Sequence, residues 1–403
     1  MSTPSATVKP VFSASERLAN VKPYMLARVF AAREEQLRRG VDVIDLGVGN
    51  PDLRPPEEAL RALEAALHDP TTQNHQYPPF AGLPEFKQAV ATWYASRFNV
   101  ALEPQSEAIA LNGSKEGIVK FLLASLNPGD SLLVGSPCYP AYLGAVSLAE
   151  ANAVEVPLLE GHGFRPDLAS IPVAAARAAR GIAVNFPGNP TGGIETAEFY
   201  SELLEFARDY DLFVMSDIAY CDLSLDPSYR TRSFLEFDRD KERTIEFHSF
   251  SKSYSMQGWR IGFAAGSSEA IALLARLKSN MDFGVFMAIQ RAAAAILTGP
   301  QDYTVRASAT YRARRDAFLD AIKPLGVPVD APRAGIYVWL PLPSSAANAE
   351  AFAADILERT GVVLAPGTAF GSAGEGYVRV ALCQTEERLR EAGARLVRAG
   401  VKY

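Results

Sequence analysis

A lysine that could act as a nucleophile lies in the stretch Ser249–Gly262, which reads S-F-S-K-S-Y-S-M-Q-G-W-R-I-G. Lys252 stands there among small hydroxyl and aromatic residues, with no charged residue within five positions on either side. Desolvation in such surroundings makes an amine a nucleophile. Arg260 offers a planar donor fork to a phosphate, and Ser249 offers a hydroxyl to the same anion. An amine beside a phosphate clamp is what pyridoxal phosphate requires, although a surface loop would also fit this stretch alone.

Length and composition predict a globular protein with room for two domains. The chain has 403 residues, of which 48% are hydrophobic and 21% are charged, and this permits a large core. A net charge of −6 argues against nucleic-acid binding as the main task. The three cysteines show neither paired nor zinc-like spacing, so we expect a reduced, cytoplasmic protein without a metal site. The sequence has no signal peptide and no membrane-length apolar run, so we expect no membrane partner.

Short apolar segments alternate with helical patterns from Ala108 onward. We expect strands at Ala108–Leu111, Ser131–Val134, Ala153–Val156, Gly181–Phe186, Leu212–Ser216, Thr244–Phe247 and Ile261–Ala265. This alternation predicts a mostly parallel, doubly wound sheet with helices on both faces. Because ligands of such sheets bind outside the carboxyl ends of the strands, the residues that follow each strand should carry the chemistry.

Functional side chains do follow these strands. The turn Asn112–Gly117 is rich in glycine and opens a helix, whose free amides could bind a phosphate. Later strand ends supply an aromatic ring, an amide, and an acid with a tyrosine, namely Tyr139, Asn189, Asp217 and Tyr220. Plainer interpretations remain open at this point, because a tyrosine after proline can be packing and an aspartate can cap a helix.

The order and spacing of these segments resemble the class I and II aminotransferases, the aspartate aminotransferase-like group of fold-type I enzymes. The signatures N-P-T-G, D-x-x-Y and S-x-S-K-x-x-x-x-x-G-x-R all occur in family order. The resemblance implies an α/β fold, with a large domain on a mostly parallel doubly wound sheet and a smaller α+β domain. We place an N-terminal arm and part of the small domain in residues 1–50, the large cofactor-binding domain in 51–290, and the small domain in 291–403.

The resemblance also implies pyridoxal 5'-phosphate as the cofactor and a role for each residue. Lys252 would carry the cofactor on its amine and later move the proton at the substrate Cα, while Asp217 would pair with the ring nitrogen. Tyr220 and Asn189 would hydrogen-bond the ring hydroxyl oxygen, and Tyr139 would stack on the ring. The phosphate would be held by Gly113, Ser114, Lys115, Ser249 and Arg260, with Ser251 adjacent, and Tyr77 would reach the phosphate of the other subunit in a homodimer.

The substrate would be an amino acid. Arg379 lies in the apolar segment Gly376–Ala381, where a buried arginine needs an anion, and a structural salt bridge would also satisfy it. The resemblance assigns Arg379, with Gly49 and Asn189, to the substrate carboxylate. The stretch Leu277–Gln290 resembles a subgroup named for LL-diaminopimelate or for alanine and aspartate. We expect transfer from LL-diaminopimelate, alanine, aspartate or an aromatic amino acid to a 2-oxo acid such as 2-oxoglutarate. Candidates for holding an anionic side chain are Arg276, Lys278 and Arg333, although we expect most of these to be surface or dimer charges.

Two other functions stay open from the sequence. A C–S β-lyase would use the same residues on the same scaffold, and would release pyruvate and ammonia without a 2-oxo acid acceptor. A non-enzymatic regulator that binds the cofactor would need a DNA-binding segment, and too few residues precede the first expected helix to form one.

Overall fold

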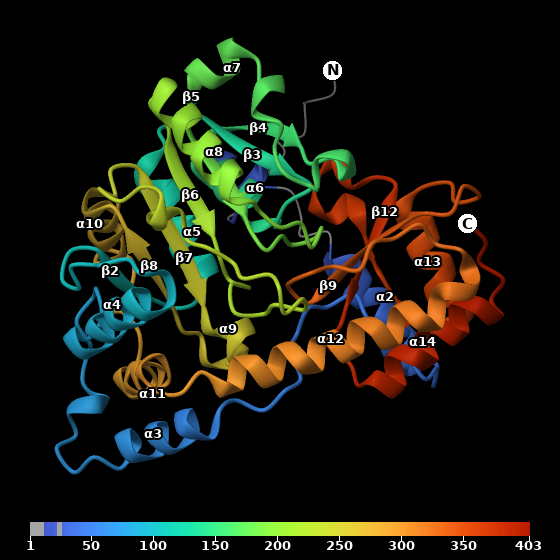
Figure 1. The fold of residues 1–403 in the computed structure, drawn as a ribbon, viewed down its shortest axis with the longest axis horizontal. Helices are drawn as coiled ribbons and strands as arrows, with labels where there is room; N and C mark the ends of the chain where they lie inside the picture. Colours follow the sequence, from blue (N-terminus) through green and yellow to red (C-terminus); the bar gives the residue numbers. More distant parts are fainter. Residues whose placement is uncertain (1–11, 22–25) are drawn as a thin grey trace, which may run out of the picture.

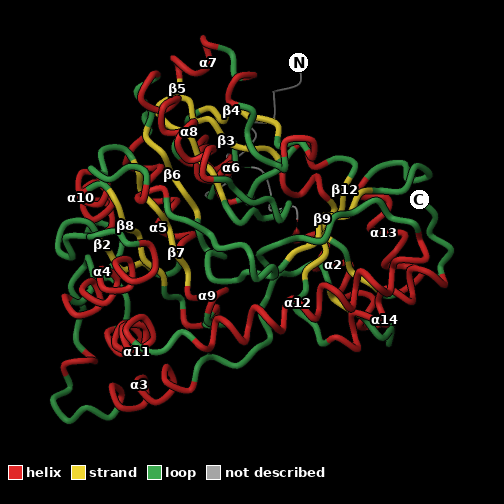
Figure 2. The backbone as a smooth tube through the Cα atoms, viewed as in Figure 1, coloured by secondary structure: helices red, strands yellow, loops and turns green. Residues whose placement is uncertain are grey.

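The structure, a computed structural model, describes residues 12–21 and 26–403. Most of the expected N-terminal arm therefore lies outside the described residues. Figure 1 shows a larger body built on strands β2 to β8 and a smaller one around β9 and β12, with the long helix α12 (Asp302–Ile322) running along both. Figure 2 shows the strands of the two bodies as separate groups.

The larger body is built on a seven-stranded sheet of order β2-β8-β7-β6-β5-β3-β4. Its strands are β2 (Ala108–Leu111), β3 (Ser131–Ser136), β4 (Asn152–Pro157), β5 (Ala179–Asn185), β6 (Phe213–Asp217), β7 (Thr244–Ser249) and β8 (Gly262–Gly266). Strand β8 is antiparallel to both of its neighbours, and the remaining pairs are parallel. The central strands are buried and apolar because helices cover both faces. The predicted mostly parallel α/β sheet is confirmed.

The helices of the larger body alternate with these strands. They are α3 (Glu57–Leu67), α4 (Pro84–Phe98), α5 (Ser114–Ser125), α6 (Ala141–Leu148), α7 (Val173–Ala178), α8 (Ala197–Asp209), α9 (Phe250–Ser253), α10 (Ser268–Lys278) and α11 (Met287–Thr298). Helix α4 begins at a proline and buries Phe86, Val90, Tyr94 and Phe98, which recur at helical spacing.

The smaller body combines described residues from the N-terminal and the C-terminal parts of the sequence. Its strands are β1 (Ile44–Asp45) paired with β10 (Val362–Val363), and the antiparallel set β11 (Ala365–Pro366), β12 (Tyr377–Ala381) and β9 (Tyr337–Pro341). Its helices include α2 (Leu26–Arg38), α13 (Ala349–Thr360) and α14 (Glu386–Arg398), while the short α1 (Glu16–Ala19) contacts α6 of the larger body. Ile44 and Leu46 share one hydrophobic core with Val378 and Leu389, which brings residues far apart in sequence into one unit.

Helix α12 links the two bodies through its packing. Tyr311 and Phe318 are buried in the core of the smaller body, whereas Tyr303 packs against the cores of both. The expected boundary at residue 290 falls within α11, whose buried residues share a core with α4. The division of the chain into domains therefore stays a prediction. Among the described helices, none is long and apolar enough to cross a membrane.

Candidate active site

A cavity of about 240 Å³ lies where strands β5, β6 and β7 end, against β9 and β12 of the smaller body. The predicted residues that line it are Gly49, Ser114, Lys115, Tyr139, Asn189, Asp217, Tyr220, Ser249, Ser251, Lys252, Arg260 and Arg379. Gly113 and Tyr77 do not line the cavity. The side chains that follow separate strands in the sequence are thus gathered in one place, as the strand-end rule for parallel sheets predicts.

The amine of Lys252 is held at the junction of the two bodies. Strand β7 ends at Ser249, whose hydroxyl accepts a hydrogen bond of 3.2 Å from the Ser251 amide and caps the short helix α9. Lys252 lies on that helix, and its Nζ donates a hydrogen bond of 2.5 Å to the carbonyl oxygen of Gly49. A Cβ at position 49 would lie 1.9 Å from the hydroxyl of Tyr337, so the turn needs glycine there.

An anion cradle lies beside this lysine. Helix α5 begins at Ser114 after Gly113, so its first amides are free to bind a ligand. The Arg260 guanidinium donates to the carbonyl oxygens of Asn112 at 3.2 Å and Gln257 at 3.0 Å. A Cβ at Gly113 would lie 2.3 Å from Nη2 of Arg260, so glycine lets the cation approach the start of the helix. A phosphate group would fit this cradle, because it could bind the guanidinium of Arg260, the N-terminus of α5 and the hydroxyls of Ser114 and Ser249.

Asp217, the last residue of β6, places a buried carboxyl group in the same cavity. It accepts hydrogen bonds from the Tyr142 hydroxyl at 2.6 Å and from the Ala219 amide at 3.3 Å. Burial raises the pKa of Asp217 to about 6, and these two hydrogen bonds act in the opposite direction. A cationic N–H group in the cavity would stabilise the charged carboxylate further.

Tyr142 was missed in the sequence prediction, which selected Tyr139 from the same segment. Tyr139 does line the cavity, and its ring meets that of Tyr142 edge-on at 5.7 Å. Tyr139 lies in the turn before α6 and Tyr142 in the first turn of that helix, and the sequence offered no signal to separate their roles.

Arg379 of β12 is buried without a carboxylate partner in the described part of the chain. Its guanidinium donates to Oδ1 of Asn189 at 2.8 Å and to the carbonyl oxygen of Gly47 at 2.7 Å. It also lies over the rings of Tyr337 at 4.2 Å and Phe370 at 4.5 Å, and its buried Nε has no hydrogen-bond partner there. The structural salt bridge considered from the sequence is therefore absent from these residues, and a cavity-facing cation remains to be neutralised.

Two further contacts fix the orientation of predicted residues. The Asn185 amide donates to the Asp217 carbonyl oxygen at 2.7 Å and accepts from the Asn189 backbone amide at 2.7 Å, which ties the turn after β5 to β6. The hydroxyls of Tyr220 and Tyr337 lie 3.2 Å apart. Neither Asn185 nor Tyr337 was predicted, because both belong to strands whose other residues are mostly apolar and typical of a core.

The remaining predicted residues lie elsewhere. Tyr77 is 80% exposed and its ring packs on Phe283 at 4.6 Å. Lys278 is fully buried between Glu116 and Asp282, and Arg333 pairs with Asp226 at 2.7 Å. None of the three possible side-chain binders Arg276, Lys278 and Arg333 is among the described residues that line this cavity.

Comparisons with known proteins agree with this geometry. The sequence model of the family described as Aminotransferase class I and II matches residues 41–396. The LL-diaminopimelate aminotransferase of Desulforudis audaxviator (strain MP104C) is 46% identical over 385 residues, covering 96% of this chain and 97% of the relative. The substrate-bound structure of BacF from Bacillus subtilis is 32% identical with a TM-score of 0.93, covering 97% of this chain and 99% of that one. A probable N-succinyldiaminopimelate aminotransferase from Thermus thermophilus is 38% identical with a TM-score of 0.87, covering 93% and 99%.

Proposed function

This chain belongs to the class I and II aminotransferase family and is an aminotransferase, and we propose that it works with pyridoxal 5'-phosphate held in the cavity around Lys252. One observation carries the proposal. A single cavity combines an amine, an anion cradle and a buried carboxyl group, and these are the three groups that such a cofactor needs. The family and the transaminase activity predicted from the sequence are confirmed.

The residues present fit this cofactor. Arg260, Ser249 and the first turn of α5 would hold the phosphate, and the glycine at position 113 leaves room for the guanidinium. Asp217 would face the ring nitrogen, since its buried carboxyl group lacks a cationic partner among the described residues. Tyr139 would cover the ring face.

When bound, the cofactor supplies an electron sink that stabilises negative charge at the substrate Cα. The chain's own residues do the rest. Lys252 would take the proton from the substrate Cα and deliver it to C4′ of the cofactor, and the carbonyl oxygen of Gly49 would hold the lysine ammonium between these steps. Asp217, kept charged with the help of Tyr142, would stabilise a protonated ring nitrogen. Tyr220 would donate to the ring hydroxyl oxygen from its buried position beside Tyr337.

Arg379 would bind the substrate α-carboxylate. Its guanidinium is positioned by Asn189 and Gly47 and packed between two rings, so little side-chain freedom is lost when the carboxylate binds. Because Arg379 and Lys252 reach the cavity from different bodies, closure of one body on the other would bring both onto one substrate and exclude water.

We propose LL-diaminopimelate as the amino donor and 2-oxoglutarate as the acceptor. The support is that relatives at 40% to 46% identity over nearly their full length are named LL-diaminopimelate aminotransferases. The test is a screen in which the purified holoenzyme is mixed with each single amino acid and the absorbance band of the lysine-bound cofactor is followed. We expect LL-diaminopimelate to discharge this band faster than alanine, aspartate or an aromatic amino acid. A faster discharge by another amino acid would refute the assignment, and release of pyruvate and ammonia would indicate the β-lyase instead.

The role of Lys252 has its own test. Reduction of the holoenzyme with borohydride should fix the cofactor on the peptide that contains Lys252, as read by mass spectrometry. Lys252→Ala should abolish both the label and transamination, because no other amine in the described part of the chain takes its position beside Gly49. The exposed Lys323→Ala, outside the cavity, is the matched control and should keep both. Retained turnover at full rate in Lys252→Ala would remove this lysine from the mechanism.

We also propose that the enzyme is a cytoplasmic homodimer with a shared active site. An exposed aromatic patch supports the dimer, in which the rings of Tyr77 and Phe80 both pack against Phe283. Patches of this kind on a protein surface usually mark an interface. Light scattering should give the mass of two chains, and Tyr77→Ala should weaken cofactor binding while Val305→Ala, exposed on α12, should not. A monomer with full activity would contradict the shared site.

A further inference from the structure

A second cavity, of about 610 Å³, lies between α4, the segment after β6 and α12. In the described ranges its wall shares no residue with that of the active-site cavity. Trp93 and Val305 give it apolar surface, while Ser96 and Tyr229 add polar groups. Its size and mixed lining suit a small organic molecule.

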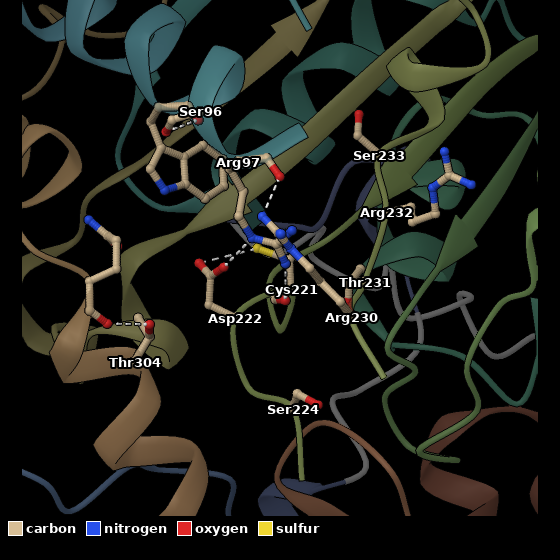
Figure 3. A network of polar contacts seen from close by, with 12 residues as sticks. Ser96, Arg97, Cys221, Asp222, Ser224, Arg230, Thr231, Arg232, Ser233 and Thr304 are labelled. Carbon is tan, nitrogen blue, oxygen red and sulfur yellow. Dashed lines mark hydrogen bonds and ion pairs between the residues drawn. The ribbon is translucent and has the colours of Figure 1, made fainter. Parts of the chain in front are cut away.

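The charged residues of this wall are three arginines and one carboxylate. They are Arg97, Arg230, Arg312 and Asp222. The carboxylate of Asp222 is already paired, because it accepts a hydrogen bond of 3.0 Å from Nε of Arg97. Nη2 of the same arginine donates to the Cys221 carbonyl oxygen at 3.1 Å. Figure 3 shows Arg97, Cys221, Asp222 and Arg230 together, and Arg230 donates a hydrogen bond of 2.6 Å to the carbonyl oxygen of Arg97. The guanidinium charges of Arg230 and Arg312 therefore have no carboxylate in this wall to neutralise them, although the net charge of the chain is −6.

Neither Arg230 nor Arg312 forms an ion pair within the described part of the chain. The acidic residues nearest in sequence to Arg230 have other partners, since Glu236 pairs with Arg232 at 2.8 Å and Asp226 with Arg333 at 2.7 Å. Partial burial and the neighbouring Arg97 lower the pKa of Arg230. A bound anion would relieve this repulsion and would accept the unused donors of both forks.

We propose that this cavity is a second anion site, which binds a small organic dianion of the phosphomonoester or dicarboxylate type between Arg230 and Arg312. The planar donor fork of arginine matches both kinds of anion, and the apolar surface beside it would cover the organic part of the ligand. The site lies close to catalytic residues, since Cys221 and Asp222 directly follow Tyr220. Ser308 of α12 donates to the Asp222 carbonyl oxygen at 3.0 Å, so both sides of the cavity are tied together.

Calorimetric titration of the holoenzyme with inorganic phosphate, and separately with succinate, tests this site. We expect saturable binding of at least one probe to the wild type, and at least tenfold weaker binding to the double variant Arg230→Gln, Arg312→Gln. Arg306→Gln is the matched control, because Arg306 lies on the same helix but not in the wall, and should bind like the wild type. Saturation by phosphate alone would identify the phosphomonoester type, and by succinate alone the dicarboxylate type.

Binding of these probes at the active site persists in the double variant, so the second site is read as the binding that the double variant loses. Equal affinity of the wild type and the double variant would overturn the proposal, as would the absence of saturable binding to the wild type. Should the double variant not fold, Arg312→Glu alone repeats the test by charge reversal on the partly exposed side of α12. Wild-type affinity in Arg312→Glu would overturn the proposal equally.

Discussion

The hydroxyl of Tyr142 donates a hydrogen bond of 2.6 Å to the carboxylate of Asp217. Both groups are buried at the end of β6, where burial alone would keep the carboxyl group neutral to higher pH. The hydrogen bond favours the charged form, which is the form that a protonated ring nitrogen requires. In the proposed mechanism Tyr142 would therefore act through Asp217.

Removal of this hydroxyl should weaken the cofactor site without unfolding it. Tyr142→Phe should raise the dissociation constant of pyridoxal 5'-phosphate roughly tenfold to a hundredfold, because a hydrogen bond to a charged group contributes about 1.5–3 kcal/mol. Fluorescence titration of the cofactor-free enzyme measures this. Tyr200→Phe is the control, since its hydroxyl donates to the Arg232 carbonyl oxygen at 2.7 Å away from the cavity. Equal cofactor affinity in Tyr142→Phe and the wild type would show that Asp217 does not depend on Tyr142.

Replacement of Arg379 should affect substrate binding more than turnover. Arg379→Lys keeps the charge but loses the planar fork, so we expect KM for the amino acid to rise roughly tenfold to a hundredfold, with a smaller fall in kcat. Steady-state kinetics with varied amino donor measures both constants. Arg388 lies on α14 and pairs with Asp42, away from the cavity, so Arg388→Lys should change neither constant. An unchanged KM in Arg379→Lys would place the substrate carboxylate elsewhere.

The pair between Asp52 and Arg314 should couple the substrate-binding turn to α12. The two guanidinium nitrogens of Arg314 bind the two carboxylate oxygens at 2.6 and 2.7 Å, and the arginine is buried. A double-mutant cycle with Asp52→Asn and Arg314→Gln, followed by denaturant unfolding, should give a coupling free energy of about 1–3 kcal/mol. The exposed pair Asp355–Arg359 on α13 should give less than about 0.5 kcal/mol in the same cycle. Equal coupling in the two pairs would contradict the structural role of the buried one.

Glu246 should make the stability of the protein depend on pH. Burial raises its pKa from 4.5 to about 7 in the folded chain, although Tyr94, Ser233 and the Phe234 amide donate to it. The folded protein therefore retains a proton that the unfolded chain has lost, so the free energy of unfolding falls as pH rises from 4.5 to about 7, and this contribution levels off above.

The size of this effect is on the order of 3 kcal/mol by linkage. Glu246→Gln imitates the protonated side chain, so we expect a shallower fall of unfolding free energy between pH 4.5 and about pH 7, measured by urea denaturation. The exposed Glu205→Gln should keep the wild-type slope. If Glu246→Gln kept that slope as well, Glu246 would be charged in the folded protein throughout this range.

Much of the fold could be predicted from local patterns. The expected strand at 108–111 matches β2, and Asn348 caps α13 as expected, because apolar runs and capping residues act over a few positions. The strand-end rule then gathered Asn189, Asp217 and Lys252 correctly. It could not find Tyr337, because an aromatic residue in an apolar strand has the same sequence pattern whether it faces a core or a ligand.

The sequence by itself determined the order of strands and helices and the family, and it led to the lysine, acid and arginine that line the candidate site. These depend on residue type and local spacing, which are present in the chain before it folds. Tertiary structure decided that Tyr142 donates to Asp217 and that the Lys252 amine donates to the carbonyl oxygen of Gly49. It also decided that the buried Lys278 forms ion pairs with Glu116 and Asp282. Such contacts join residues that are distant in sequence, so packing of the complete sheet and of the smaller body against it is what brings them together.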